Sequence, residues 1–353
     1  MRKIMRNVYY IRKSYKAMIL FTVIVAIFLG SSSNSTAQDF HLSQYNAAPL
    51  YLNPAMTGMF SGSYRAHIHY RDQWRSVASP FTTAMVAFDM PWKKFGVGAM
   101  ILNDRAGVGN YNVLNFNLAG AYDFAIDSAK QHHFSVGPQI GFIHKSVNMD
   151  KLLFQTQYTN SNSGGFDPGL PNGEITSNAS IILPDLNLGV MYYYSNDRFV
   201  VNPFIGFSVF HITQPKQSFY ENDSRLPRRY VFHLGTKINL TPLVQITPQM
   251  FVMNQVNANE KTISIEASYY LKSQDSWVFA GITYRSFEFK EFSTSDAFIL
   301  LIGMKYSRFT GRISYDINTS SLTTVSNGRG GIELSLTYVA SKVRIPKPSC
   351  PRL

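Results

Sequence analysis

Two histidines at strand spacing are the first residues in this sequence that could do chemistry. They lie in the stretch SYRAHIHYRDQW, residues 63–74, as His67 and His69. Alternate residues of a strand point the same way, about 7 Å apart, so the pair could bind a metal ion such as zinc. No third histidine, cysteine or paired carboxylate lies nearby, and a strand with one polar face already accounts for both positions. We therefore expect a polar strand face with no metal and no cofactor.

Nucleophilic catalysis would need a serine or cysteine presented beside a histidine and an acid. The chain has no Gly-x-Ser-x-Gly sequence, and His211, in FHITQP, has no evident serine partner. His132 and His133 are adjacent, so on a strand they face opposite ways. Phosphate loops, dinucleotide fingerprints and EF-hand loops are also absent from the sequence. We expect a protein that is not an enzyme, with a hydrolase embedded in a barrel as the alternative.

The N-terminus has the pattern of an export signal. Residues 1–16 carry six Lys or Arg and no acidic residue, and an apolar run follows at 17–29. Ser35 and Ala37 are the small residues that signal peptidase needs, so we expect cleavage between Ala37 and Gln38. The apolar run is shorter than the roughly 20 residues of a membrane-spanning helix, which disfavours the alternative of a retained anchor.

The chain that remains after cleavage is only mildly basic. Loss of the leader lowers the formal net charge from +12 to +6, and no block rich in Lys or Arg remains. Together with export, this argues against nucleic acid as a partner. Cys350 is the single cysteine, so the chain has no internal disulfide and no cysteine-type zinc spacing.

The stretch around the two histidines alternates with a period of two residues, which predicts a strand. One face carries Tyr64, Ala66, Ile68 and Tyr70, and the other carries Arg65, His67, His69 and Arg71. The run at 263–272 repeats the pattern, with Glu266 on its polar face. We expect Arg65, His67, His69, Arg71 and Glu266 to line the polar interior of a barrel.

Alternating runs recur along the whole chain. They cover residues 64–71, 81–90, 95–102, 114–123, 134–145, 186–194, 200–210, 230–240, 244–253, 263–272, 277–287, 297–306, 309–317 and 332–338. Their length suits tilted membrane strands, and the composition of 14% aromatic and 15% charged residues suits a membrane barrel. The fold class expected is all-β, a transmembrane antiparallel β-barrel of about 14 strands. A soluble sandwich is the alternative, but so many long strands would leave exposed edges.

Short motifs then tie the chain to a family. Motifs along the chain resemble the PorP/SprF family of outer-membrane proteins of the type IX secretion system. These are QDFHLSQYNAAPLYLNPAMTG (38–58), YRDQW (70–74), PFTTAMVAFDMP (80–91), FHITQP (210–215), SYDINTSSL (314–322), GGIELSLTY (330–338) and CPRL (350–353). The motifs are collinear over essentially the whole chain that follows the leader. The family typically ends in an aromatic residue, whereas this chain ends in Leu353.

The resemblance implies a cellular location and binding partners. It implies a non-enzymatic barrel in the outer membrane of a Bacteroidota-type cell, in contact with membrane lipid and lipopolysaccharide. Members are thought to bind the C-terminal sorting domain of secreted surface proteins such as adhesins and to anchor them, and many support gliding motility. Some contact periplasmic or outer-membrane subunits of the secretion machinery. The alternative function on the same fold is a porin or small-solute transporter.

The chain therefore divides into four expected parts. Residues 1–37 are the signal peptide, 38–62 an N-terminal plug or periplasmic segment, 63–340 the barrel and 341–353 a periplasmic tail. The plug-like segment mixes apolar and chain-breaking residues, and such backbone cannot face lipid. The polar loop 159–180 is expected at the cell surface. The tail cannot be a membrane strand, and the residues expected to contact periplasmic partners are Lys342, Arg344, Lys347, Cys350 and Arg352. A disordered tail without partners is the alternative.

Overall fold

The computed structural model describes residues 39–75, 79–159, 165–171, 173, 180–196, 200–219, 223–289, 292–321 and 323–341. The expected signal peptide, with Ala37 and Gln38, lies outside the described residues. So does most of the expected tail, with Lys342, Arg344, Lys347, Cys350 and Arg352.

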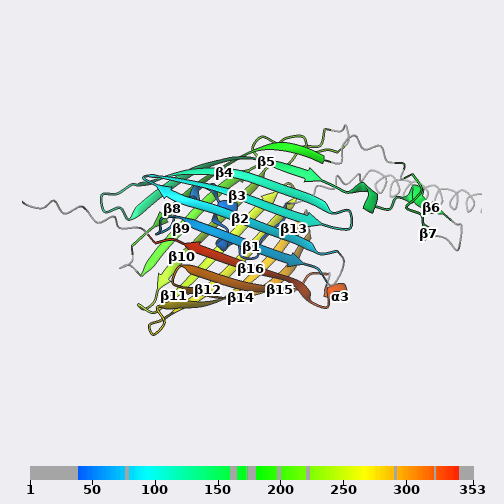
Figure 1. Ribbon diagram of the computed structural model, residues 1–353. Helices are drawn as coiled ribbons and strands as arrows, with labels where there is room; N and C mark the ends of the chain where they lie inside the picture. The colour runs from blue at the N-terminus through cyan, green and yellow to red at the C-terminus, as the bar shows by residue number, and fades with distance from the viewer. Residues whose placement is uncertain are drawn as a thin grey trace, which may run out of the picture. The chain divides into compact units, whose positions relative to one another are not determined.

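Fourteen antiparallel strands form a closed barrel in which β1 pairs with both β2 and β16 (Figure 1). The strands are β1 (Arg65–Gln73), β2 (Phe81–Trp92), β3 (Phe95–Ala106), β4 (Tyr111–Ala125), β5 (His132–Ser146), β8 (Ser180–Tyr194), β9 (Val201–Phe210), β10 (Arg229–Asn239), β11 (Val244–Gln255), β12 (Ala258–Leu271), β13 (Ser276–Phe289), β14 (Phe292–Tyr306), β15 (Phe309–Asn318) and β16 (Arg329–Val339). The predicted barrel of about 14 strands is confirmed, one strand for each alternating run.

Short elements complete the fold. A separate hairpin pairs β6 (Tyr158–Thr159) with β7 (Gly165–Phe166). The helical turns are η1 (Tyr45–Ala47), α2 (Pro49–Leu52), η2 (Pro54–Met56), η3 (Met149–Lys151), η4 (Gln155–Gln157) and α3 (Thr323–Ser326). Among the described residues, no helix is long and apolar enough to cross a membrane.

Strand β8 begins at Ser180, six residues before the predicted start at Leu186. The added part of β8 contains Pro184, and proline cannot donate to a sheet ladder. The backbone of Leu186 faces β9, since its carbonyl accepts from Ile212 N at 2.9 Å. Pro184 lies two residues before Leu186, so its backbone faces the same side. Strand β9 has ended at Phe210, and the Pro184 carbonyl accepts from Thr213 Oγ1 at 3.1 Å. The missing N–H therefore breaks no bond between strands.

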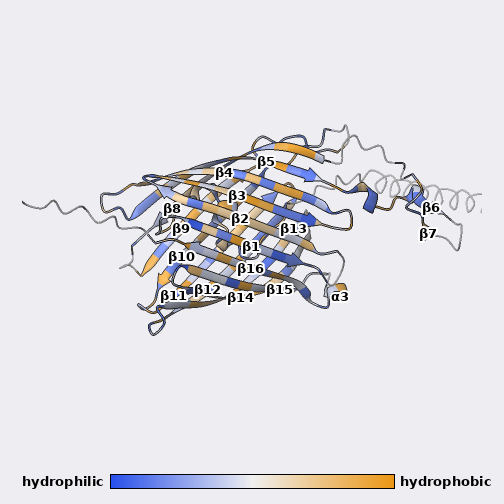
Figure 2. Cartoon of the chain, in the orientation of Figure 1, coloured by the Kyte–Doolittle hydropathy of each residue, from blue (hydrophilic) through white to orange (hydrophobic). Residues whose placement is uncertain are grey.

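The two faces of the barrel wall differ in chemistry (Figure 2). In β2 the outward side chains Val86 and Phe88 are 57% and 44% exposed, whereas the inward Met85 and Asp89 are 2% and 0% exposed. This alternation repeats around the barrel and gives an apolar outer surface suited to lipid.

The two ends of the barrel also differ. At one end, here the turn end, the connections 93–94, 126–131, 195–200, 240–243, 272–275 and 307–308 are short. At the other end, the loop end, lie the three longest connections, 147–179, 211–228 and 319–328, together with the shorter 74–80, 107–110, 256–257 and 290–291. In outer-membrane barrels, short turns face the periplasm and long loops face the exterior.

Candidate functional site

The N-terminal residues 39–58, here the inner segment, lie inside the barrel and run along its length. At the loop end, Asp39 N donates to Gln255 Oε1 at 2.7 Å. Near the turn end, Gly58 N donates to Asp89 Oδ2 at 2.7 Å. Further along the chain, Ser63 N donates to Ala340 O at 2.8 Å, and β1 begins two residues later at Arg65.

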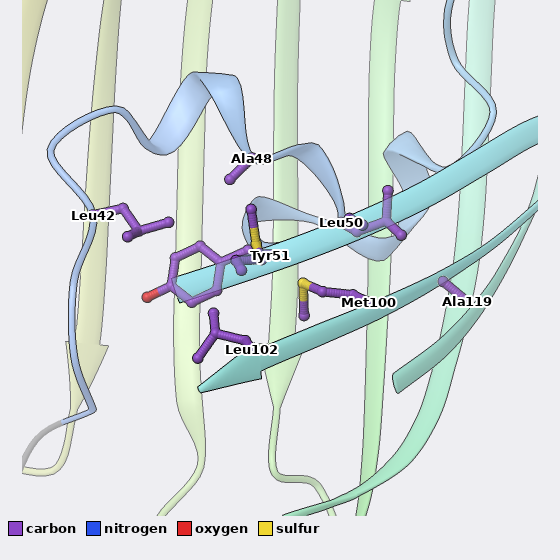
Figure 3. Packing of buried hydrophobic residues seen from close by; sticks show 9 residues of the cluster. Leu42, Ala48, Leu50, Tyr51, Met100, Leu102 and Ala119 are labelled. Atoms are coloured by element: carbon purple, nitrogen blue, oxygen red, sulfur yellow. The ribbon is translucent and has the colours of Figure 1, made fainter. Parts of the chain in front are cut away.

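Apolar side chains pack the inner segment against the wall (Figure 3). Leu50 and Tyr51 of α2 lie against Met100 and Leu102 of β3, and all four are at most 5% exposed. On another side, Tyr45 stacks on Phe251 of β11 with ring centroids 4.7 Å apart. Burial of this apolar surface favours a fixed position of the segment in the lumen.

A buried network of charges holds the beginning of the segment. The Arg71 guanidinium bonds Glu333 at 2.7 Å and Asp316 at 2.9 Å, and Arg285 bonds the same Asp316 at 2.9 Å. None of these four side chains is more than 2% exposed. Buried charges are tolerated only when they are paired and hydrogen-bonded, so each residue here depends on the others.

The backbone of the inner segment takes part in this network. Ser43 N and Gln44 N donate to the two oxygens of Glu333 at 2.8 and 2.7 Å, and Ser43 Oγ donates to Asp316 at 2.7 Å. One carboxylate of β16 thus accepts from both the barrel wall and the segment inside it. The segment is therefore bound through fixed backbone groups.

A β-bulge supplies a further acid to the network. Opposite Arg285 and Ser286, the register of β14 shifts from Ala297 to Ser295, which leaves Asp296 as the extra residue. Its carboxylate accepts from Arg285 Nε at 2.6 Å. Bulges re-aim side chains in this way, and here the bulge brings an acid to the inner face.

The later part of the segment is held by close backbone contact. Asn53 Nδ2 donates to Val190 O at 3.0 Å, and Ser208 Oγ donates to Leu52 O at 3.0 Å. A Cβ on Gly189 would lie 1.9 Å from Asn53 Oδ1, closer than any side chain tolerates. Glycine at this strand position therefore makes room for the segment.

A histidine with two carboxylates lies at the loop end. His211 Nδ1 contacts Asp185 at 2.9 Å and its Nε2 contacts Asp39 at 2.8 Å, while Arg229 is 3.4 Å from Asp39. Burial lowers the pKa of His211, but the two carboxylates outweigh it and raise the pKa to about 9. Both ring nitrogens are used for these contacts, which leaves neither to activate a serine.

The five residues expected in the lumen are all placed on the inner face, each with a partner. Arg65 bonds Asp89 at 2.7 Å, His67 bonds Thr337 at 2.8 Å, His69 bonds Glu333 at 2.6 Å and Glu266 bonds Arg312 at 2.6 Å. Arg71 belongs to the charge network. In the part of the chain that the structure describes, no three His, Cys, Asp or Glu side chains are arranged to hold a metal ion, and His67 and His69 have separate partners.

Sequence reasoning missed the acidic half of the network. Asp316 and Glu333 lie in the motifs SYDINTSSL and GGIELSLTY, at inward positions of alternating runs. Their inward positions in the alternating runs could have identified them as buried carboxylates that must pair with cationic side chains. Their pairing with Arg71 could not be found, because it depends on how the barrel closes.

Comparison with known proteins supports the same fold. The family model described as "Type IX secretion system membrane protein PorP/SprF" matches residues 34–338. A search of curated proteins finds no match. The solved "CymD monoaromatic hydrocarbon channel" has a TM-score of 0.50 at 12% identity and covers 87% of this chain and 95% of its own. The toluene transporter TodX of Pseudomonas putida has a TM-score of 0.48 at 11% identity and covers 87% and 96%. Fold and family match together identify an outer-membrane β-barrel.

Proposed function

We propose a function from the premise that this chain belongs to the PorP/SprF family of type IX secretion system membrane proteins. The protein is an outer-membrane component of that system. Within it, we propose that the barrel binds secreted surface proteins through their C-terminal sorting domain and anchors them, without catalysing a reaction, and supports gliding motility where the cargo is an adhesin.

The observation that carries the proposal is the occupied lumen. The inner segment extends along the barrel and is bound through Glu333 near one end and through Asn53 further along. A channel needs a continuous polar path, whereas this segment places buried apolar side chains such as Leu50 and Leu52 in the interior. We propose that the inner segment is a plug, which favours a binding function.

The loop end offers the surface for a secreted partner. The connection between β5 and β8 presents Leu153, Tyr158 and Phe166, which are 54%, 52% and 50% exposed. Exposed apolar groups beyond the wall, gathered on one loop, are typical of protein interaction sites. The part of the expected cargo loop 159–180 that the structure describes includes Phe166.

The second candidate is a porin or small-solute transporter. It is favoured by the fold shared with the monoaromatic hydrocarbon channel. At 12% identity that likeness extends to the fold alone, so the segment inside the lumen is the stronger argument.

Partners on the periplasmic side form a further part of the proposal. With fourteen strands, both ends of the barrel domain lie at the turn end, near Ser63 and Ala340. The tail that follows contains Lys342, Arg344, Lys347, Cys350 and Arg352, and we propose that it contacts subunits of the secretion machinery. The apolar outer surface contacts lipid, and the loop rim contacts lipopolysaccharide.

Deletion of the gene tests the proposal. A specific cargo is expected to leave the cell surface for the medium, while other type IX cargo is still secreted. Surface proteomics of the deletion strain and a complemented strain gives the readout. Unchanged display of every cargo in the deletion strain would contradict the proposal. Affinity purification from outer membranes with mass spectrometry then identifies the cargo.

A further inference from the structure

A partly open cavity of about 420 Å³ lies at the loop end, where Arg71 and Asp296 of the charge network form part of its lining. Its volume falls within the roughly 300–1,000 Å³ of ligand sites in proteins. Aromatic rings form much of its wall: Phe40 of the inner segment, Trp74 after β1, Phe81 of β2 and Phe287 of β13. Because these residues come from four separate elements, closure of the barrel builds the cavity.

The rings are held in place by neighbouring structure. Trp74 and Phe81 meet edge to face, with centroids 5.1 Å apart and planes at 85°. Trp74 has φ +59°, a left-handed conformation that is rare for a bulky residue, and its N–H donates to Gly330 O at 3.0 Å. Such strain persists where the surrounding structure imposes it, often at binding sites. The ring centroids of Phe287 and His41, which also line the cavity, are 5.3 Å apart.

Among the described residues, the charges around the cavity leave one carboxylate without a cation. Asp39 pairs with His211 and Arg229, and Asp296 pairs with Arg285. Arg71 is already bound to Asp316 and Glu333.

Asp104 is the exception among the acids that line the cavity. Thr83 donates to its Oδ1 at 2.6 Å, and no cation lies within ion-pair distance of its carboxylate among the described residues. Aromatic faces attract cations, and a carboxylate beside them adds a charge-assisted hydrogen bond.

We propose that this cavity binds a lysine or arginine side chain presented by the secreted partner. The ammonium or guanidinium group pairs with Asp104, while the aliphatic part packs against the rings of Trp74 and Phe81 that line the cavity. An acidic side chain would meet Asp104 with like charge, and a neutral one would leave the carboxylate unpaired. The inference rests on the proposed function only in assigning the ligand to a secreted protein.

Peptide binding to the detergent-purified full-length protein tests the cavity. Trp92→Phe and Trp277→Phe leave Trp74 as the only tryptophan. We expect acetyl-Gly-Lys-Gly-amide to change the Trp74 fluorescence saturably, and the glutamine analogue to bind at least roughly tenfold more weakly. Asp104→Asn is expected to weaken binding of the lysine peptide roughly tenfold or more, because the substitution keeps the hydrogen bond from Thr83 but removes the negative charge.

The matched control is Glu288→Gln. Glu288 also lies towards the loop end, but it pairs with Lys261 and does not line the cavity. Loss of the Glu288 charge is expected to leave peptide binding unchanged. An equal loss of affinity in Glu288→Gln and Asp104→Asn would indicate a general charge effect and overturn the proposal. Equal binding of the two peptides, or no saturable response to the lysine peptide, would also overturn it. If Asp104→Asn does not fold, Phe81→Leu serves instead, with the same loss expected.

Failure of the cavity proposal can be separated from failure of the proposed function. If the deletion strain loses its cargo while the cavity variants bind peptide normally, only the cavity proposal is wrong. If the deletion strain displays every cargo, the proposed anchoring function is wrong, whatever the result of the peptide-binding experiment.

Discussion

The inner segment is held by two different chemistries on two parts of the barrel wall. Around Ser43 and Gln44, strands β1, β13, β15 and β16 present buried charges. Glu333 of β16 accepts from the two backbone N–H groups, and the charges of the other three strands contact Ser43 Oγ. Around Asn53, strands β5, β8 and β9 present small residues, backbone carbonyls and hydroxyl groups. The contact around Ser43 and Gln44 depends on the balance of buried charges. The contact around Asn53 depends on the small size of the side chains on the wall.

This difference predicts how each contact fails. Removal of one charge leaves its partners buried without compensation, which is among the largest single effects in protein stability. Addition of a methyl group to a close contact forces small shifts and costs less. The charged wall is therefore expected to be the more sensitive of the two.

The largest effect is expected for Glu333→Gln. The substitution keeps the shape but removes the charge that faces Arg71 and His69, so the free energy of unfolding should fall by about 3–5 kcal/mol. Denaturant unfolding followed by gel mobility of unheated samples measures the change. Glu288→Gln, at an exposed pair with Lys261, is the control and should change little. Equal stability of the two variants would show that the network does not hold the barrel and segment together.

A smaller effect is expected for Gly189→Ala. The added Cβ would overlap Asn53 Oδ1, and overpacking of this kind costs about 1–3 kcal/mol. Gly120→Ala is the matched control, because the nearest atom to its added Cβ is 3.9 Å away. Limited proteolysis should also cleave the inner segment sooner in Gly189→Ala alone. Identical behaviour of the two alanine variants would contradict the close contact.

The smallest effect is a pH dependence at His211. Its pKa is raised to about 9, so its charge stabilises the folded state fully below pH about 6.5, and this stabilisation is lost as the pH rises through about 9. The stability difference between the wild type and His211→Gln should shrink over that range. The loss is limited because Arg229 still faces Asp39. A difference that stays constant up to pH 10 would rule out the charged histidine.

Local periodicity was sufficient to predict the fold. The alternation of polar and apolar residues, such as His67 and His69 against Ile68 and Tyr70, is set by the strand itself, so fourteen strands could be identified one by one. The extent of β8 could not, because consecutive apolar residues at 181–183 interrupt the alternation, and only their pairing with β5 shows that they belong to the strand. A strand boundary of this kind depends on a neighbour remote in sequence.

The candidate site was only half accessible from the sequence. Arg71 and His69 were expected in the lumen, but their common partner Glu333 lies 262 and 264 positions away. Arg71 and Glu333 become direct cross-strand neighbours only through the register in which β1 meets β16. The cavity near Trp74 depends on the same closure, so no local pattern could reveal it.

The proposed function requires a barrel that is closed by its own inner segment and that holds a partner instead of passing solutes. Conductance in planar lipid bilayers tests it most directly, with a variant that lacks residues 39–58 as the control for insertion. The intact protein is expected to give no steady current, while the shortened variant conducts. A steady open channel in the intact protein would contradict the claim and favour the porin.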